Sequence, residues 1–250
     1  MIAKKIEKEL KKLGTKERAA MNAYFFKTEK GQYGEGDIFL GVTVPDTRII
    51  VKKYISDATV EDAVELLYSK YHESRLAACM LFVELMKIAI KKNDEKMQKK
   101  IFNAYIKHAT KINNWDLVDT SASSVVGYYI SEKMEHEERL KTINKLIASK
   151  NLWENRIIVV GTHYQIKKGN ERMLFYVAEH MMDHKHDLMH KAIGWMLREV
   201  GKYSGQKVLN EFLDKHAHYM PRTMLRYAIE RHEPEWKKKY MEMKKSHMVE

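Results

Sequence analysis

The residues best suited to chemistry lie in the stretch NNWDLVDT at 113–120, which joins a tryptophan to two aspartates. Trp115 and Asp119 stand four residues apart, so on a helix their side chains are neighbours one turn apart. Asp116 falls in the first turn of that helix, where the helix dipole favours a carboxylate and is enough to account for it. Asp119 lies beyond the reach of that effect. It is therefore the candidate functional acid, able to stabilise a developing positive charge or to orient a water molecule.

A second tryptophan, Trp195, stands among cations on a helix expected over 187–201. The apolar stripe of this helix faces one way, whereas Trp195 points the other way together with Lys191 and Arg198. Such a tryptophan either packs against the next helix pair or stacks on a ligand. Both interpretations stay open at this point.

A basic stripe is expected along a helix over 153–168, because Arg156, His163 and Lys167 stand at positions i, i+7 and i+11. Such a stripe is usually a solvated face, but it also suits contact with phosphates. The whole chain is basic, with 45 Lys and Arg against 34 Asp and Glu and a formal net charge of +11. This balance indicates a nucleic acid or another anionic surface as partner, or simply a soluble basic protein.

The elements that must position these residues are helices. The chain of 250 residues has three prolines, few glycines within periodic segments and scarce strand signals. The apolar periodicity predicts an all-α fold with helices near 2–12, 15–27, 46–56, 60–70, 73–91, 95–110, 115–130, 136–149, 153–168, 171–183, 187–201, 205–217, 221–231 and 234–245.

Related openings recur along the chain, in HESRLAACML, KNLWENRIIVV, MHKAIGWML and MPRTMLRYAI, each with a basic residue ahead of an apolar stretch. This degenerate repeat predicts an α-solenoid of HEAT-like antiparallel helix pairs with a concave basic groove, forming a single repeat domain over 1–250. An irregular helical bundle is the alternative.

Other signals limit cofactors and location. The one cysteine, Cys79, lies in an apolar run and suits a reducing compartment. The N-terminus lacks the apolar segment of a signal peptide, and no apolar run is long enough to span a membrane, so we expect a cytoplasmic protein. His186 and His190 are spaced to hold a metal, but without an HExxH or cysteine pattern we expect no metal and no cofactor. A monomer is the default expectation.

Four stretches in order carry a resemblance to a known family: YGEGDIFLGVTVPDTR at 33–48, WDLVD at 115–119, LWENR at 152–156 and AIGWMLRE at 192–199. Together they resemble the AlkD family of DNA alkylation-repair glycosylases. The resemblance implies a HEAT-like solenoid that grips duplex DNA and excises alkylated purines. It places the catalytic aspartate at Asp119, the two aromatic site residues at Trp115 and Trp195, and a DNA-contacting arginine at Arg156. Thr43 departs from the pattern, because some relatives carry a longer polar side chain there.

The residues suit the implied chemistry. An N3- or N7-alkylated purine already carries positive charge, so it leaves without a general acid, and one carboxylate can stabilise the sugar cation. We therefore expect base excision from double-stranded DNA that contains alkylated purines. Asp119, Trp115 and Trp195 are expected to be catalytic, and the DNA-binding residues to be Arg156, Arg198, Lys191, Lys167 and His163. A helical-repeat nucleic-acid-binding module without chemistry is the alternative, and a protein-binding scaffold is a third. N7-methylguanine, N3-methyladenine and bulkier adducts all suit a site that recognises charge.

Overall fold

A computed structural model of the chain describes residues 1–243. The residues cluster into two compact units, the first Met1–Tyr129 and the second beginning at Ile130. Repeated helix pairs bury their apolar faces mainly against their neighbours, so compact sub-units also arise within one repeat domain. The single domain over 1–250 and its concave groove stay predictions.

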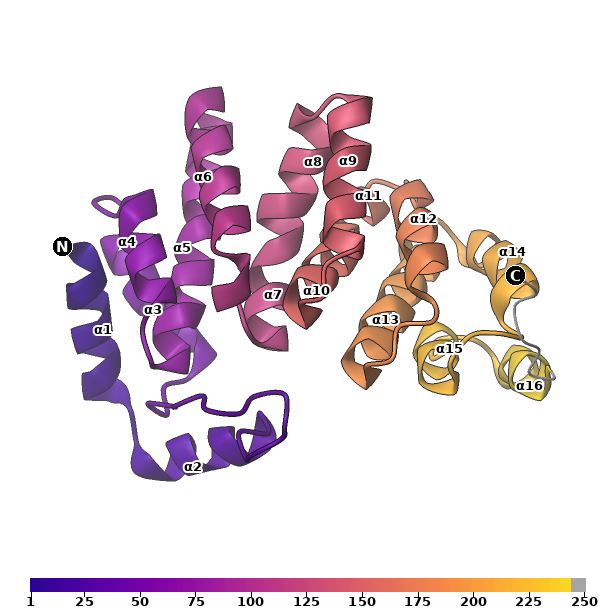
Figure 1. Ribbon diagram of the computed structural model, residues 1–250, viewed down its shortest axis with the longest axis horizontal. Coiled ribbons are helices and arrows are strands. Elements are labelled where there is room, and N and C mark those ends of the chain that lie inside the picture. The colour runs from indigo at the N-terminus through magenta and orange to yellow at the C-terminus, as the bar shows by residue number, and fades with distance from the viewer. Residues whose placement is uncertain (244–250) are drawn as a thin grey trace. The chain divides into compact units, whose positions relative to one another are not determined.

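Every regular element in residues 1–243 is a helix (Figure 1), and the only β-type pairing in that range is an isolated bridge between Ile38 and Tyr71. The prediction of an all-α fold built from repeated helices is confirmed. None of the helices in this range is long and apolar enough to cross a membrane.

The first unit is built around α5, most of whose residues are buried. It packs against α3, α4, α6 and α7. The elements of this unit are α1 (Ile2–Leu13), α2 (Lys16–Phe25), α3 (Val44–Tyr54), α4 (Val60–Leu67), α5 (His72–Lys91), α6 (Glu95–Lys107), the short 3₁₀ helix η1 (Ala109–Lys111), α7 (Trp115–Ala122) and the π-helical segment η2 (Ser123–Gly127).

The second unit is built around α13, which packs against α10, α14 and α15. Its elements are α8 (Tyr128–Lys133, which begins at the boundary), α9 (His136–Ile147), α10 (Leu152–Gly161), α11 (His163–Ile166), α12 (Arg172–Met181), α13 (Asp187–Tyr203), α14 (Gln206–His216), α15 (Arg222–Ala228) and α16 (Pro234–Glu242). Residues 244 and 245, expected at the end of the last helix, lie outside the described residues.

Side-chain caps fix several helix starts. Thr59 and Asp62 form a reciprocal capping box at the start of α4, and the Asp62 carboxylate also accepts a 3.0 Å hydrogen bond from the backbone N–H of Ala3 in α1. Thr43 caps α3, with Pro45 in its first turn. Threonine and aspartate are typical capping residues and proline is typical of a first helical turn, so the sequence alone indicates both helix starts.

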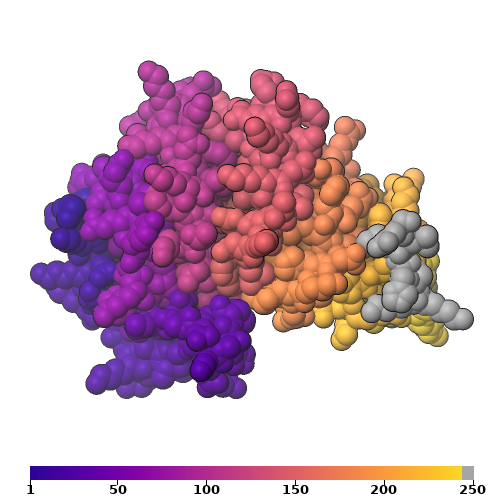
Figure 2. All heavy atoms as spheres, in the orientation of Figure 1, coloured from indigo at the N-terminus to yellow at the C-terminus, as the bar shows by residue number. Residues whose placement is uncertain are grey.

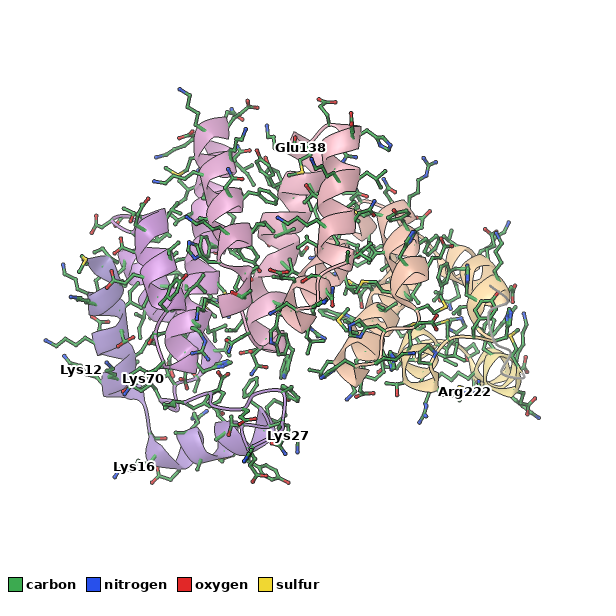
Figure 3. All side chains as sticks on the ribbon, viewed as in Figure 1. Lys12, Lys16, Lys27, Lys70, Glu138 and Arg222 are labelled. Atoms are coloured by element: carbon green, nitrogen blue, oxygen red, sulfur yellow. The ribbon has the colours of Figure 1, made fainter. Side chains whose placement is uncertain are left out.

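Helix α2 differs from its neighbours because none of its residues is buried. Figure 1 shows it apart from the other helices of its unit, and Figure 2 shows this part of the chain as a protrusion at the lower edge. In Figure 3 Lys16 marks its first residue, and Lys27 lies just beyond its end. Its connection to the unit needs Gly41, whose φ is +82° and whose added Cβ would lie 2.2 Å from the Thr15 carbonyl oxygen. The loop 26–43 that follows α2 then returns to α5.

Glu73, in the first turn of α5, holds that returning loop. Its buried carboxylate accepts hydrogen bonds from the backbone N–H groups of Leu40, Gly41 and Val42 at 2.8 to 3.2 Å. The backbone N–H of His72 donates to the Ile38 carbonyl at 2.8 Å. The loop containing Asp37 is thereby fixed against the N-terminal end of α5.

Two helices expected to be continuous are interrupted. The helix expected over 115–130 runs as α7, then as the π-helical segment η2, then as α8. The helix expected over 153–168 breaks at Thr162, whose hydroxyl donates to the Val159 carbonyl at 2.6 Å and competes with the helical backbone pattern. The π-helical segment begins shortly after Asp119, and the break at Thr162 directly precedes His163.

Candidate functional site

Helix α7 carries Trp115 and Asp119 on adjacent turns, as the sequence predicts. Asn114 caps the helix, because its side-chain oxygen accepts a 2.8 Å hydrogen bond from the Trp115 backbone N–H. Trp115 and Asp119 are both half-buried. An indole and a carboxylate therefore lie on adjacent turns of one helix, and neither is fully buried in the core.

The Trp115 indole is held by two aromatic side chains from the end of α2. The ring of Phe26 stacks on it with centroids 5.1 Å apart and planes 21° apart. The ring of Phe25 meets it edge-on at 5.9 Å, although 61% of Phe25 is exposed. The indole is thus braced on one side by a helix that is otherwise scarcely packed.

Asp116 has a partner that the sequence does not reveal. Its Oδ2 lies 2.8 Å from Nε2 of His72, and Nδ1 of the same ring lies 3.0 Å from Oδ2 of Asp37. The other oxygen of Asp37 pairs with the guanidinium of Arg75 at 2.5 Å. The helix dipole alone is therefore an incomplete explanation of Asp116, because the residue also belongs to a buried ionic cluster. We call Asp37, His72, Arg75 and Asp116 the Asp–His–Asp cluster.

Electrostatics keep two members of this cluster, His72 and Asp37, ionised. Burial by itself would lower the pKa of His72, but the charge of Asp116 and the hydrogen bonds to Asp116 and Asp37 outweigh it and raise that pKa to about 9. Burial would raise the pKa of Asp37, yet the hydrogen bond from His72 and the charge of Arg75 hold it below its ordinary value. At neutral pH the cluster accordingly contains an imidazolium.

Asp119 stands one turn after Trp115, over the core of the first unit. Burial raises the pKa of Tyr105 well above its ordinary value, and the negative charge of Asp119 adds to the rise. The Tyr105 hydroxyl instead shares a 2.7 Å hydrogen bond with Ser121, which also donates to the Leu117 carbonyl. This buried pair ties α6 to α7.

A cleft of about 220 Å³ in the first unit is lined by side chains of α3, α5, α7 and η2. Arg48, Lys52 and Lys87 bring three cations to it, and Thr120, next to Asp119 in the chain, lies on its wall. Lys87 also pairs with Glu84 at 2.7 Å. Sequence reasoning missed these three cations because they come from two helices without a repeated spacing.

In the second unit, α13 presents Trp195 as a half-buried side chain. The residue before it, Gly194, lets α15 approach closely, since an added Cβ would lie 2.4 Å from the Met224 carbonyl oxygen and 2.5 Å from Cβ of Tyr227. The Trp195 ring faces His163, with centroids 6.0 Å apart. The indole is therefore placed by a glycine contact and bordered by an imidazole.

His163 differs from the expected phosphate-binding cation. Burial lowers its pKa to about 4, with the nearby charge of Lys167 adding to the effect and Glu199 opposing it. The distance from its Nε2 to Oε2 of Glu199 is 3.9 Å, too long for a hydrogen bond. His163 is consequently neutral at pH 7. A contact between His163 and a phosphate stays a prediction, and it would have to be a hydrogen bond from the neutral imidazole N–H rather than an ion pair.

Arg156 lies inside the second unit rather than on an exposed stripe. Only 5% of the residue is exposed, and its Nη1 donates a 2.7 Å hydrogen bond to the Leu188 carbonyl at the start of α13. The expected stripe of Arg156, His163 and Lys167 is thus not a single solvated face. Lys167, just beyond α11, is the exposed member of the three.

The remaining predicted cations lie along α13. Lys191 pairs with Asp187 at 2.7 Å, and Arg198 is paired with Glu230. Glu199 is buried, with charged groups of Arg198, Lys202 and Arg231 lying 3.6 to 3.9 Å from its carboxylate. Trp195 therefore sits beside a cluster of cations arranged around one buried acid. Residues 1–243 contain no group of three metal-ligating side chains.

Comparison with known proteins adds one family and one fold. The profile of a family described as DNA alkylation repair enzyme matches residues 6–232. Among solved structures, the chain is similar to a predicted DNA alkylation repair enzyme from Enterococcus faecalis, at 15% sequence identity and a TM-score of 0.64. The match covers 88% of this chain and 97% of that one, and at this identity it establishes the fold alone. None of the curated proteins matches significantly.

Proposed function

Because the chain belongs to the DNA alkylation repair enzyme family, we propose that it is a DNA glycosylase. Its substrates would be N3- and N7-alkylated purines in duplex DNA, and its reaction the hydrolysis of the bond between base and sugar. The observation that carries the proposal is the pairing of Trp115 and Asp119 on adjacent turns of α7 in a strongly basic chain. A groove that only bound phosphates would lose affinity by keeping that carboxylate.

The proposed reaction needs few groups from the protein. The alkylated purine is a cation, so it takes the bonding electron pair and leaves as a neutral base without a proton. Positive charge develops on the sugar, and a carboxylate next to that position stabilises it. Water adds to the sugar carbon and its proton passes to the solvent, which leaves an abasic site. We assign the stabilising carboxylate to Asp119.

The indoles of Trp115 and Trp195 are proposed to bind the charged base rather than to take part in bond breaking. A tryptophan face attracts a cation by roughly 0.5–2 kcal/mol, depending on how far the pair is desolvated. Trp115 and Trp195 are both half-buried, so each keeps a surface that can meet a ligand. We assign to them the recognition of the charged nucleotide. Selection by charge suits several alkylated bases rather than one.

Phosphate contacts are assigned to the cations. Lys167, Lys191 and Arg198 are the candidates from the sequence that keep exposed or half-exposed charge in the structure. Arg156 is buried and holds α13, so its part in DNA binding would include keeping that helix in place. Arg48, Lys52 and Lys87 add a second group of cations in the first unit.

The test is single-turnover release of 7-methylguanine from a methylated duplex. Asp119→Asn keeps the side-chain shape and removes the charge, so we expect excision to slow by about 100-fold or more while binding of undamaged duplex stays nearly constant. Asp57→Asn is the matched control, because Asp57 is an exposed acid in a turn of the same unit. Release at the wild-type rate by the Asp119 variant would exclude this role.

The cation-lined cleft also favours a second candidate, a helical-repeat module that binds nucleic acid without chemistry. The same assay separates the two. Tight binding of methylated duplex by the wild-type protein, with no base released, would favour the binding module.

A further inference from the structure

The Asp–His–Asp cluster has a geometry that fixes the protonation state of His72. An ionised carboxylate only accepts hydrogen bonds, and a neutral imidazole can donate from only one nitrogen. Both nitrogens of His72 lie within 3.0 Å of a carboxylate oxygen. Two hydrogen bonds of this kind require both nitrogens to carry a proton. His72 therefore serves as a cationic bridge between two acids.

The bridge reaches Trp115 along the backbone. Asp116 follows Trp115 directly and bonds to Nε2 of His72. Asn114 precedes Trp115 and donates to Oδ2 of Asp37 at 3.2 Å. The residues on both sides of the tryptophan are thus tied to one cluster, and with them the first turn of α7.

A second route runs through stacked rings. Phe39 stacks on the His72 ring with centroids 4.4 Å apart. Phe26 lies over the same ring at 5.0 Å and also stacks on Trp115. The indole is therefore coupled to the imidazolium both through its neighbours in the chain and through Phe26.

Stability alone does not explain the cluster. His72 is 2% exposed and the Asp37 side chain 4%, and buried ion pairs rarely stabilise more than apolar residues of the same volume. Asp116 Oδ1 and Arg75 Nε are buried and find no hydrogen-bond partner within residues 1–243. A cluster that costs desolvation and leaves these atoms unpaired is better explained by the geometry that it imposes.

We propose that His72 is the positioning residue of the candidate site: as an imidazolium held between Asp37 and Asp116, it fixes the first turn of α7 and the orientation of the Trp115 indole. It touches no reacting atom in this scheme. Its effect on excision rests on the proposed function, whereas its effect on Trp115 does not.

The first arm of the test needs no DNA. Nitrogen-15 NMR of the full chain should show both His72 ring nitrogens protonated at pH 7, with a titration midpoint near 9, the value the structure supports. In Asp116→Asn the midpoint should fall, because one negative charge has gone, and the Trp115 indole N–H resonance should shift. Trp115→Phe identifies that resonance among the four tryptophans. Glu137→Gln is the matched control, since Glu137 is an exposed acid in the first turn of α9.

The second arm measures excision of 7-methylguanine against pH. Wild-type activity should fall as the pH rises through the His72 titration. Asp116→Asn should move this fall to lower pH but keep most activity at pH 6.5, because its amide oxygen still accepts from Nε2. Asp116→Ala, which cannot accept, should lose about 10- to 100-fold even there, as expected for a misplaced site.

The outcomes separate the two claims. A neutral His72 at pH 7, or an unchanged His72 midpoint and Trp115 resonance in Asp116→Asn, would overturn the positioning role even if the wild-type protein excises bases. A protein that excises nothing, but shows the NMR shifts, would retain the positioning role and lose the glycosylase proposal. Should Asp116→Asn fail to fold, the wild-type nitrogen spectrum alone still decides whether His72 is an imidazolium.

Discussion

At the scale of single residues, Asp116 and Asp119 show how three positions along one helix change the surroundings of a carboxylate. Asp116 faces an imidazolium at 2.8 Å, so its charge is matched inside the protein. Asp119 stands about one turn later and is half-buried, and its charge helps to raise the pKa of Tyr105. The first acid therefore suits a role in holding the helix, whereas the proposed role of Asp119 toward a ligand rests on its place one turn after Trp115.

The raised pKa of His72 makes folding stability depend on pH. The ordinary pKa of 6.5 applies to the unfolded chain and about 9 to the folded one. The stabilisation is thus fully present below pH 6.5 and is lost as the pH rises through about 9. At 1.36 kcal/mol per pKa unit, the loss would reach about 3 kcal/mol for the wild-type protein.

Urea unfolding of the wild-type protein and Asp116→Asn at several pH values measures this loss. We expect the free energy of unfolding to fall less with rising pH in the variant, because its His72 pKa is already closer to the ordinary value. Parallel curves for the two proteins would mean that Asp116 does not raise the pKa of His72.

At the scale of elements, Gly194 sets the distance between α13 and α15. Its added Cβ would meet backbone and Cβ atoms at 2.4 and 2.5 Å, which cannot move without shifting a helix. Gly194→Ala should therefore destabilise the protein by about 1–3 kcal/mol, as overpacked cores do. It should also slow base excision by displacing Trp195. Urea unfolding and single-turnover release check both effects.

Gly201→Ala is the control in the same helix. Its Cβ would meet only Gln206 Oε1 at 2.9 Å and Leu209 Cδ2 at 3.0 Å, the ends of flexible side chains. We expect a small change of either sign, because alanine also favours helix by about 1 kcal/mol. Equal losses from both substitutions would mean that the contact of Gly194 with α15 has no special importance.

The positions of the helices show which parts of the fold can be predicted from the sequence. Apolar periodicity and caps such as Thr59 with Asp62 placed the helices, because these signals are local. The π-helical segment after α7 and the break at Thr162 were missed, since the periodicity continues across both.

For the candidate site, spacing predicted the pairing of Trp115 and Asp119 but not the partners around them. His72 meets acids 35 and 44 residues away, a relation that no local pattern contains. Arg156 was predicted on a basic stripe with His163 and Lys167 because of their helical spacing, yet its guanidinium donates to the Leu188 carbonyl at the start of α13. The sequence shows which residues share a helix face, and tertiary packing decides whether that face meets water.

At the scale of the whole molecule, the formal net charge of +11 predicts DNA binding that weakens steeply with salt. The logarithm of affinity should fall linearly with the logarithm of salt concentration, by about 0.9 for each phosphate neutralised. The cleft lined by Arg48, Lys52 and Lys87 is where we expect part of this contact in the first unit.

The double variant Lys52→Gln with Lys87→Gln tests that assignment. If both lysines neutralise phosphates, the salt slope for an undamaged duplex should become shallower by about 2, measured by fluorescence anisotropy at a series of salt concentrations. The control, Lys141→Gln with Lys145→Gln on α9, removes the same charge from two exposed positions. A control that flattens the slope equally would mean that net charge acts without a defined contact. An unchanged slope in the cleft variant would place the phosphates elsewhere on the protein.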